Sequence, residues 1–86
     1  MSKFEKLLLR LKSKPRDFTY SELKNVLTGL GYFEVNQGKT SGSRVGFINE
    51  ETKHLIRLHK PHPGNILKAY QIELLLDELK KRGIIQ

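Results

Sequence analysis

Residues Tyr32 to His59 read YFEVNQGKTSGSRVGFINEETKHLIRLH, and along most of this stretch hydrophobic and polar residues alternate with a period of two. Such alternation is typical of β-strands that are buried on one face. Two prolines, Pro61 and Pro63, follow almost at once and exclude further ladder pairing. The stretch therefore predicts three antiparallel strands joined by short connections, over residues 32–36, 44–48 and 54–59.

The segment before these strands predicts a helix with a defined start and end. Thr19 and Glu22 stand three residues apart, as in a capping box, where each side chain satisfies a free backbone N–H. Hydrophobic residues then follow at helical spacing as far as Leu30. We expect the helix to end at Gly29 or Gly31, because glycine readily adopts the left-handed conformation found at helix C-termini.

A helix is also predicted toward each end of the chain. The first covers residues 2–14 and ends at Pro15, which lacks a backbone N–H. The last begins with Asn65 as its cap and ends near Arg82. Its predicted buried side consists of Ile66, Ala69, Ile72, Leu75, Leu76 and Leu79. Because a three-stranded sheet needs a cover on one face, we expect an α+β fold in which helices pack on an antiparallel sheet.

Composition limits the classes of function. A chain of 86 residues makes a single domain, expected to span residues 1–86. It has no cysteine, which excludes a disulfide scaffold, a thiol nucleophile and Cys-ligated metal sites. No stretch approaches the roughly 20 apolar residues that cross a bilayer, and the first residues lack a signal-peptide core. We expect a soluble cytoplasmic protein with no metal site and no cofactor.

The charge of the chain indicates a polyanionic partner. Lys and Arg number 16 against nine Asp and Glu, which leaves a net charge of +7. On a small domain this surplus favours nucleic acid, an anionic membrane or an acidic protein. The first predicted helix is basic and amphipathic, a pattern also found in helices that lie on membranes, although packing of one face on the core is the commoner use. We expect no membrane association.

Three short motifs occur in order between Phe18 and Leu79, namely Leu30-Gly31-Tyr32, Gly38-Lys39-Thr40-Ser41-Gly42-Ser43 and Pro61-His62-Pro63-Gly64. In this order and spacing they resemble the HicA family of bacterial toxins from toxin–antitoxin pairs. The resemblance implies a HicA-like core at residues 18–82 and an N-terminal helical extension at residues 1–14. It also implies a double-stranded-RNA-binding-like α-β-β-β-α fold. The implied activity is that of an RNA-cleaving toxin, an mRNA interferase, held inactive by a HicB-like antitoxin.

The chain departs from the family pattern at one position. The family places a catalytic histidine directly after Gly-Ser, where this chain has Arg44. A guanidinium stays charged and cannot accept a proton. If residues 50–53 form the turn, His59 stands opposite Arg44, so His59 is a candidate for the missing acid–base function and Arg44 for holding the scissile phosphate. The alternative is that His59 is an exposed strand residue that contributes only polarity.

The other two histidines have different expected roles. His62 matches the proline-flanked motif of the family, and we expect it to shape the loop or to contact a phosphate. His54 lies at the predicted turn, where we expect it to be a bystander.

The loop before the second predicted strand is suited to binding phosphate. Glycines make it flexible, and it presents a lysine, hydroxyl groups and backbone N–H groups. It is not a Walker A loop, because the first glycine of that motif is missing and a strand follows instead of a helix. A plain polar hairpin loop is the alternative. The predicted RNA-binding residues are Lys39, Thr40, Ser41, Ser43, Arg44, Arg57, Lys60 and His62.

Two questions stay open at the level of sequence. The rings of Tyr20, Tyr32, Phe33 and Tyr70 can stack on bases, but core packing fits their positions at least as well. A non-catalytic RNA-binding module on the same fold is the alternative to a nuclease. Arg44 at the histidine position favours the binding module, whereas the family motifs around it favour the enzyme.

Overall fold

The structure is a computed structural model that describes residues 2–35, 44–61 and 64–85. Within these residues the chain forms three helices and a three-stranded antiparallel sheet, so the predicted α+β class is confirmed. The helices are α1 (Lys3–Lys12), α2 (Tyr20–Gly29) and α3 (Ala69–Lys81). The strands are β1 (Tyr32–Val35), β2 (Arg44–Asn49) and β3 (Leu55–His59).

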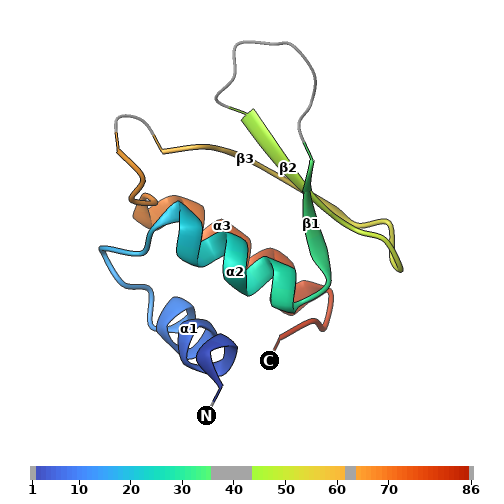
Figure 1. Cartoon of the computed structure of the whole chain (residues 1–86), viewed down its shortest axis with the longest axis horizontal. Helices are drawn as coiled ribbons and strands as arrows, with labels where there is room; N and C mark the ends of the chain where they lie inside the picture. Colours follow the sequence, from blue (N-terminus) through green and yellow to red (C-terminus); the bar gives the residue numbers. More distant parts are fainter. Residues whose placement is uncertain (1, 36–43, 62–63, 86) are drawn as a thin grey trace.

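Two helices cover one face of the sheet (Figure 1). The strands lie in the order β1-β2-β3, with α2 and α3 on the same side of them, while α1 packs on α2 at the side away from the sheet. The core between the layers includes Leu23, Val26, Leu27, Tyr32, Val45, Phe47, Ile56, Ile72, Leu75, Leu76 and Leu79. This order and layering are compatible with the double-stranded-RNA-binding-like arrangement.

The first two helices begin with capping boxes. Thr19 Oγ1 accepts a hydrogen bond from the backbone N–H of Glu22 at 3.1 Å, and the Glu22 carboxylate accepts one from the backbone N–H of Thr19 at 2.9 Å. Ser2 and Glu5 make the same exchange at the start of α1. At the other end of α2, Gly31 has a φ of +94°, which confirms the predicted left-handed helix end.

The start of α3 differs from the prediction. Asn65 does not cap a helix, because the chain stays extended as far as Lys68, which is the N-cap. Ile66 forms a backbone bridge with Thr19, just before α2. This pairing turns Leu67 into the core and leaves Ile66 46% exposed, the reverse of what helical spacing predicts.

Smaller differences concern other element ends. α1 ends at Lys12 and so is shorter than predicted, and Lys14 beyond it has a positive φ of 55°. β3 begins one residue later than predicted, at Leu55. Ala69, predicted to be buried, is exposed in the first turn of α3. Asn36, the predicted end of the first strand, lies outside the described residues.

The predicted register of the second hairpin is confirmed. The paired residues are Arg44 with His59, Val45 with Leu58, Gly46 with Arg57, Phe47 with Ile56, and Ile48 with Leu55. Val45 and Phe47 are buried against the helices. Because successive side chains point to opposite faces, alternate residues face away from α2 and α3. We call this the outer sheet face, and its described side chains are Phe33, Val35, Ile48, Leu55, Arg57 and His59.

Candidate nucleic-acid interface

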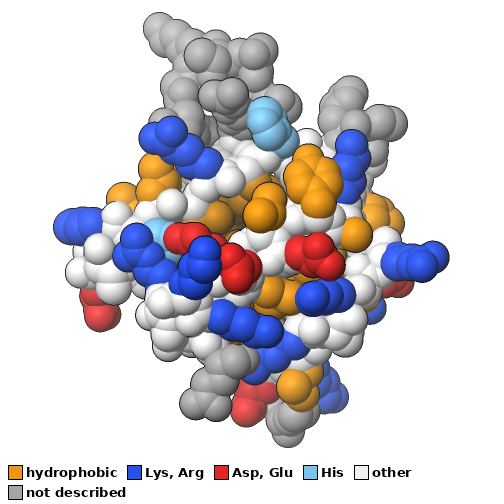
Figure 2. Space-filling model, turned by 180° about the vertical axis from the view of Figure 1, so that it is seen from behind, with side chains coloured by type: hydrophobic (Ala, Val, Ile, Leu, Met, Phe, Trp, Pro, Cys, Tyr) orange, Lys and Arg blue, Asp and Glu red, His pale blue; other side chains and the backbone are white. Residues whose placement is uncertain are grey.

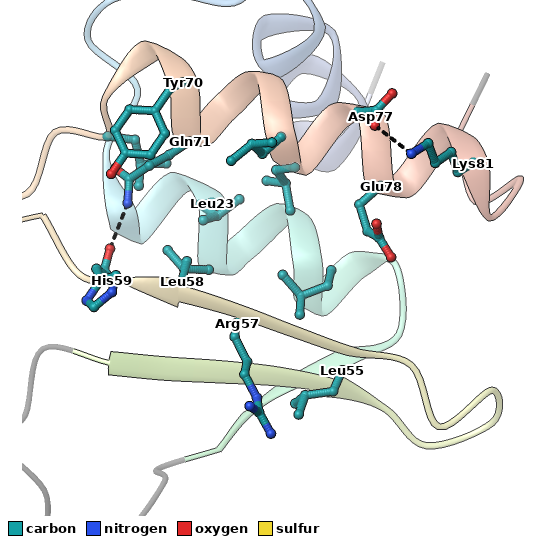
Figure 3. A pocket seen from close by; sticks show the side chains of 14 residues that line it. Leu23, Leu55, Arg57, Leu58, His59, Tyr70, Gln71, Asp77, Glu78 and Lys81 are labelled. Carbon is teal, nitrogen blue, oxygen red and sulfur yellow. Dashed lines mark hydrogen bonds and ion pairs between the residues drawn. The ribbon is translucent and has the colours of Figure 1, made fainter.

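The outer sheet face carries basic and hydrophobic side chains. Arg57 and His59 are both exposed there, and Figure 3 shows Arg57 directed away from α2 and α3. Glu34 is the acidic residue of the described strands, and it lies on the helix side, where the Tyr20 hydroxyl donates to it and Lys24 Nζ is 3.1 Å away. In the described parts of the three strands, the outer sheet face therefore holds no carboxylate, which suits a polyanionic ligand.

The negative charge of Glu34 is engaged by its neighbours. The hydrogen bond from Tyr20 lowers the pKa of Glu34, and Lys24 acts in the same direction, while partial burial opposes them. Burial raises the pKa of Tyr20, and the carboxylate beside it adds to this effect, so the hydroxyl stays protonated as the donor. Glu34 thus stays ionised and directed toward α2, not toward the outer sheet face.

The structure brings together some of the predicted site residues. Arg57 and His59 share the outer sheet face, and the backbone of Arg44 pairs directly with that of His59. Lys60 is exposed but is placed toward α2, with Nζ 5.4 Å from the centre of the Tyr20 ring. The remaining predicted residues, Lys39, Thr40, Ser41, Ser43 and His62, lie outside the described residues.

The end of β3 that carries His59 is held by α3. The side-chain amide of Gln71 donates a hydrogen bond from Nε2 to the backbone oxygen of His59 at 2.9 Å (Figure 3). This oxygen lies on the open edge of the sheet, where no further strand satisfies it in the described chain. The bond fixes the backbone at the position where the candidate histidine projects.

His54, predicted to be a bystander at the turn, is a buried part of the structure on the helix side of the sheet. His54 is 5% exposed, with Nδ1 2.7 Å from the Tyr32 hydroxyl and Nε2 2.8 Å from Glu78 Oε1. Because a carboxylate only accepts, Nε2 donates to Glu78, and Nδ1 on the other side of the ring pairs with the Tyr32 hydroxyl. The three residues connect the β2–β3 turn with β1 and α3. The period of two in the sequence could have revealed this, since it places His54 on the same face as Ile56 and Leu58.

His54 and His59 do not form one site. They lie five residues apart along an extended chain, which corresponds to about 16 Å, and they face opposite sides of the sheet. His54 therefore has a structural role on the helix side, and His59 is the histidine that belongs to the outer sheet face.

A groove of about 580 Å³ lies between β3 and α3 (Figure 3). Hydrophobic side chains such as Leu58 and Leu75 line it, and Asp77, Glu78 and Lys81 add charges of both signs. Figure 2 shows this side of the molecule, where acidic side chains lie between basic ones around a hydrophobic middle. Asp77 Oδ2 and Lys81 Nζ are 3.3 Å apart and neutralise each other. The groove is thus less suited to phosphate than the outer sheet face.

Comparison of the chain with family models, with curated proteins and with solved structures gives no match. In the described part of the chain, no helix has the length and hydrophobicity that crossing a membrane requires. The same residues contain no group of three or more His, Asp or Glu side chains placed to hold a metal ion.

Proposed function

We propose that this protein is a HicA-like, RNA-directed toxin, an mRNA interferase that binds RNA on the outer sheet face. The register of β2 and β3, which places Arg44 directly opposite His59, is the observation that carries the proposal. Opposed residues of an antiparallel pair have Cα atoms about 4.5–5.5 Å apart, so the two belong to one site. Arg57, two residues from His59 on the same face, adds positive charge.

The proposed reaction is cleavage by the RNA's own 2′-hydroxyl. His59 accepts the 2′-hydroxyl proton, and the 2′ oxygen attacks the adjacent phosphorus. The bond from phosphorus to the 5′ oxygen breaks, and the imidazolium returns the proton to that oxygen. Arg44 holds the phosphate and stabilises the added negative charge of the transition state. A positioned acid–base group contributes about 10²–10⁴ in rate.

A HicB-like antitoxin is the proposed partner. An acidic protein that covers the outer sheet face would compete with RNA for Arg57 and His59, because complementary charge both speeds association and selects the partner. An mRNA substrate also implies that the protein acts in the cytoplasm.

Expression of the chain alone in a bacterial host tests this proposal. We expect growth arrest with new RNA 5′ ends by primer extension, and we expect both to be lost in His59→Ala and in Arg44→Ala. Lys3→Ala, which removes a basic side chain from α1 on the far side of α2, is the control and should arrest growth like the wild type. Arrest that persists in His59→Ala would exclude this histidine as the catalytic group.

The second candidate function is a non-catalytic RNA-binding module on the same fold. Arg44 at the position of the family's histidine is the observation that favours it, because the chain then lacks the acid–base group at its usual place. Intact cellular RNA and normal growth, together with RNA binding by the purified protein at low salt, would select this function over the nuclease.

A further inference from the structure

The structure separates the four aromatic residues that could stack on bases. Tyr32 is completely buried, and Tyr20 is partly buried with its hydroxyl bonded to Glu34. Tyr70 is exposed but lies on α3 beside the groove with acidic residues. Phe33 is 54% exposed on the outer sheet face. It is therefore the aromatic side chain that shares a face with Arg57 and His59.

Phe33 begins a hydrophobic row across the sheet. It pairs with Ile48, which in turn pairs with Leu55, and both of these side chains are partly exposed. Arg57 occupies the next row on the same face. With strands about 4.8 Å apart and about 3.3 Å per residue, Phe33 and Arg57 are about 12 Å apart at the backbone. A flat ring and a cation thus stand on one open surface within reach of the same short strand.

We propose that Phe33 is a base-stacking site and that the ligand of the outer sheet face is single-stranded RNA. An unpaired base lies on the Phe33 ring while Arg57 contacts a phosphate of the same strand, the combination by which open sheets bind single strands. Bases inside a duplex are stacked on both faces and cannot reach the ring. This inference rests on the proposed RNA-binding function.

The charge of the surface favours RNA over a second copy of the chain as the occupant. Arg57 and His59 lie beside the hydrophobic row with no described carboxylate on this face, an arrangement that suits the phosphates of a polyanion. A second copy of the chain would bring two sets of the same basic side chains together, without a described carboxylate on this face to neutralise them.

Fluorescence anisotropy with a labelled 2′-O-methyl oligouridylate measures binding without cleavage, because the attacking hydroxyl is blocked. We expect Phe33→Ala and Phe33→Leu each to weaken binding about 5- to 150-fold. Phe33→Leu keeps the hydrophobic surface and loses only the aromatic ring. Leu74→Ala is the matched control, since Leu74 is 64% exposed on α3, and it should bind like the wild type.

Two further readouts separate stacking from a general loss of binding. The slope of log K against log salt should stay unchanged in Phe33→Ala, because no phosphate contact is lost. The chain has no tryptophan, so Phe33→Trp provides a single indole whose fluorescence a stacked base should quench.

The possible outcomes are distinguishable. Wild-type affinity in both Phe33→Ala and Phe33→Leu, with the wild type binding normally, would overturn the stacking site and leave the RNA-binding function standing. If Phe33→Ala weakened binding to an RNA duplex of the same length as much as it weakens binding to the single strand, the preference for single strands would be overturned. Absence of wild-type binding even at low salt would overturn the RNA-binding function itself, and the stacking site with it.

Discussion

At the scale of single residues, the imidazole of His54 lies in the core with a partner on each nitrogen, Tyr32 on one side and Glu78 on the other. In the described chain every buried side-chain nitrogen and oxygen has a hydrogen-bond partner. Burial raises the pKa of Tyr32, so its hydroxyl stays protonated and forms its hydrogen bond with Nδ1 of His54. The Tyr32 side chain and the His54 ring are both buried, so the Tyr32 hydroxyl depends on His54 for its hydrogen bond.

Tyr32→Phe tests this dependence, because it leaves Nδ1 of His54 buried without a partner. We expect the free energy of unfolding to fall by about 1–3 kcal/mol. Tyr70→Phe removes the same hydroxyl from an exposed ring and should change stability by less than about 0.5 kcal/mol. Urea denaturation followed by circular dichroism measures both variants. Equal stability of Tyr32→Phe and Tyr70→Phe would contradict the role of the network.

The lowered pKa of Glu34 predicts that the folded protein loses stability in acid. Its pKa is lowered in the folded protein, first by the hydrogen bond from Tyr20 and then by Lys24, relative to an ordinary value of 4.5. The unfolded chain therefore binds this proton more readily. The stabilisation is complete above about pH 4.5 and is lost as the pH falls through the lower folded-state pKa.

Denaturation of Glu34→Gln between pH 7 and pH 3 measures this contribution. The stability of the variant should fall less steeply with acid than that of the wild type. Tyr20→Phe should also flatten the profile, because it removes the largest influence on this pKa. Parallel profiles for all three proteins would show that Glu34 makes no such contribution.

At the scale of elements, α1 packs on α2 through an unusually close contact at Gly29. A Cβ added to Gly29 would overlap the ring of Phe4, although the glycine itself is exposed. Leu11 of α1 is completely buried in the common core. The absence of a side chain at Gly29 thus lets α1 approach α2 closely.

The effect of Gly29→Ala on the free energy of unfolding is expected to have opposite signs in the wild type and in Phe4→Ala. Alanine favours a helix over glycine by about 1 kcal/mol, but overpacking against Phe4 costs about 1–3 kcal/mol. The substitution should therefore lower the free energy of unfolding in the wild type and raise it in Phe4→Ala. A double-mutant cycle in urea measures this coupling. The same sign in both backgrounds would show that Phe4 does not limit the packing of the two helices.

The elements also show how far sequence reasoning reaches. The register and the sidedness of β2 and β3 could be predicted, because alternation and turn length fix them together. The start of α3 could not, because Asn65 has the chemistry of a helix cap but its backbone oxygen accepts a hydrogen bond from Tyr20 at the start of α2. The placement of Lys60 over the Tyr20 ring likewise depends on packing between β3 and α2, which no local pattern encodes.

At the scale of the whole molecule, a net charge of +7 is spread unevenly over the surfaces. The α3 side mixes acidic and basic side chains (Figure 2), whereas the outer sheet face carries Arg57 and His59 without a described carboxylate. Binding that depended on net charge alone would respond equally to the loss of any lysine or arginine. Binding on the outer sheet face would respond mainly to residues there.

The salt dependence of RNA binding distinguishes these cases. Each phosphate contact of a single strand contributes about 0.7 to the slope of log K against log salt, because a bound cation releases a counterion. Arg57→Ala should reduce the slope by about that amount. Lys3→Ala removes the same formal charge from an exposed position on α1 and should leave the slope unchanged. Lys60→Ala should fall between them, since Lys60 lies over Tyr20 at the edge of the helix side. Equal slopes for Arg57→Ala and Lys3→Ala would mean that RNA responds to total charge and is not held on the outer sheet face.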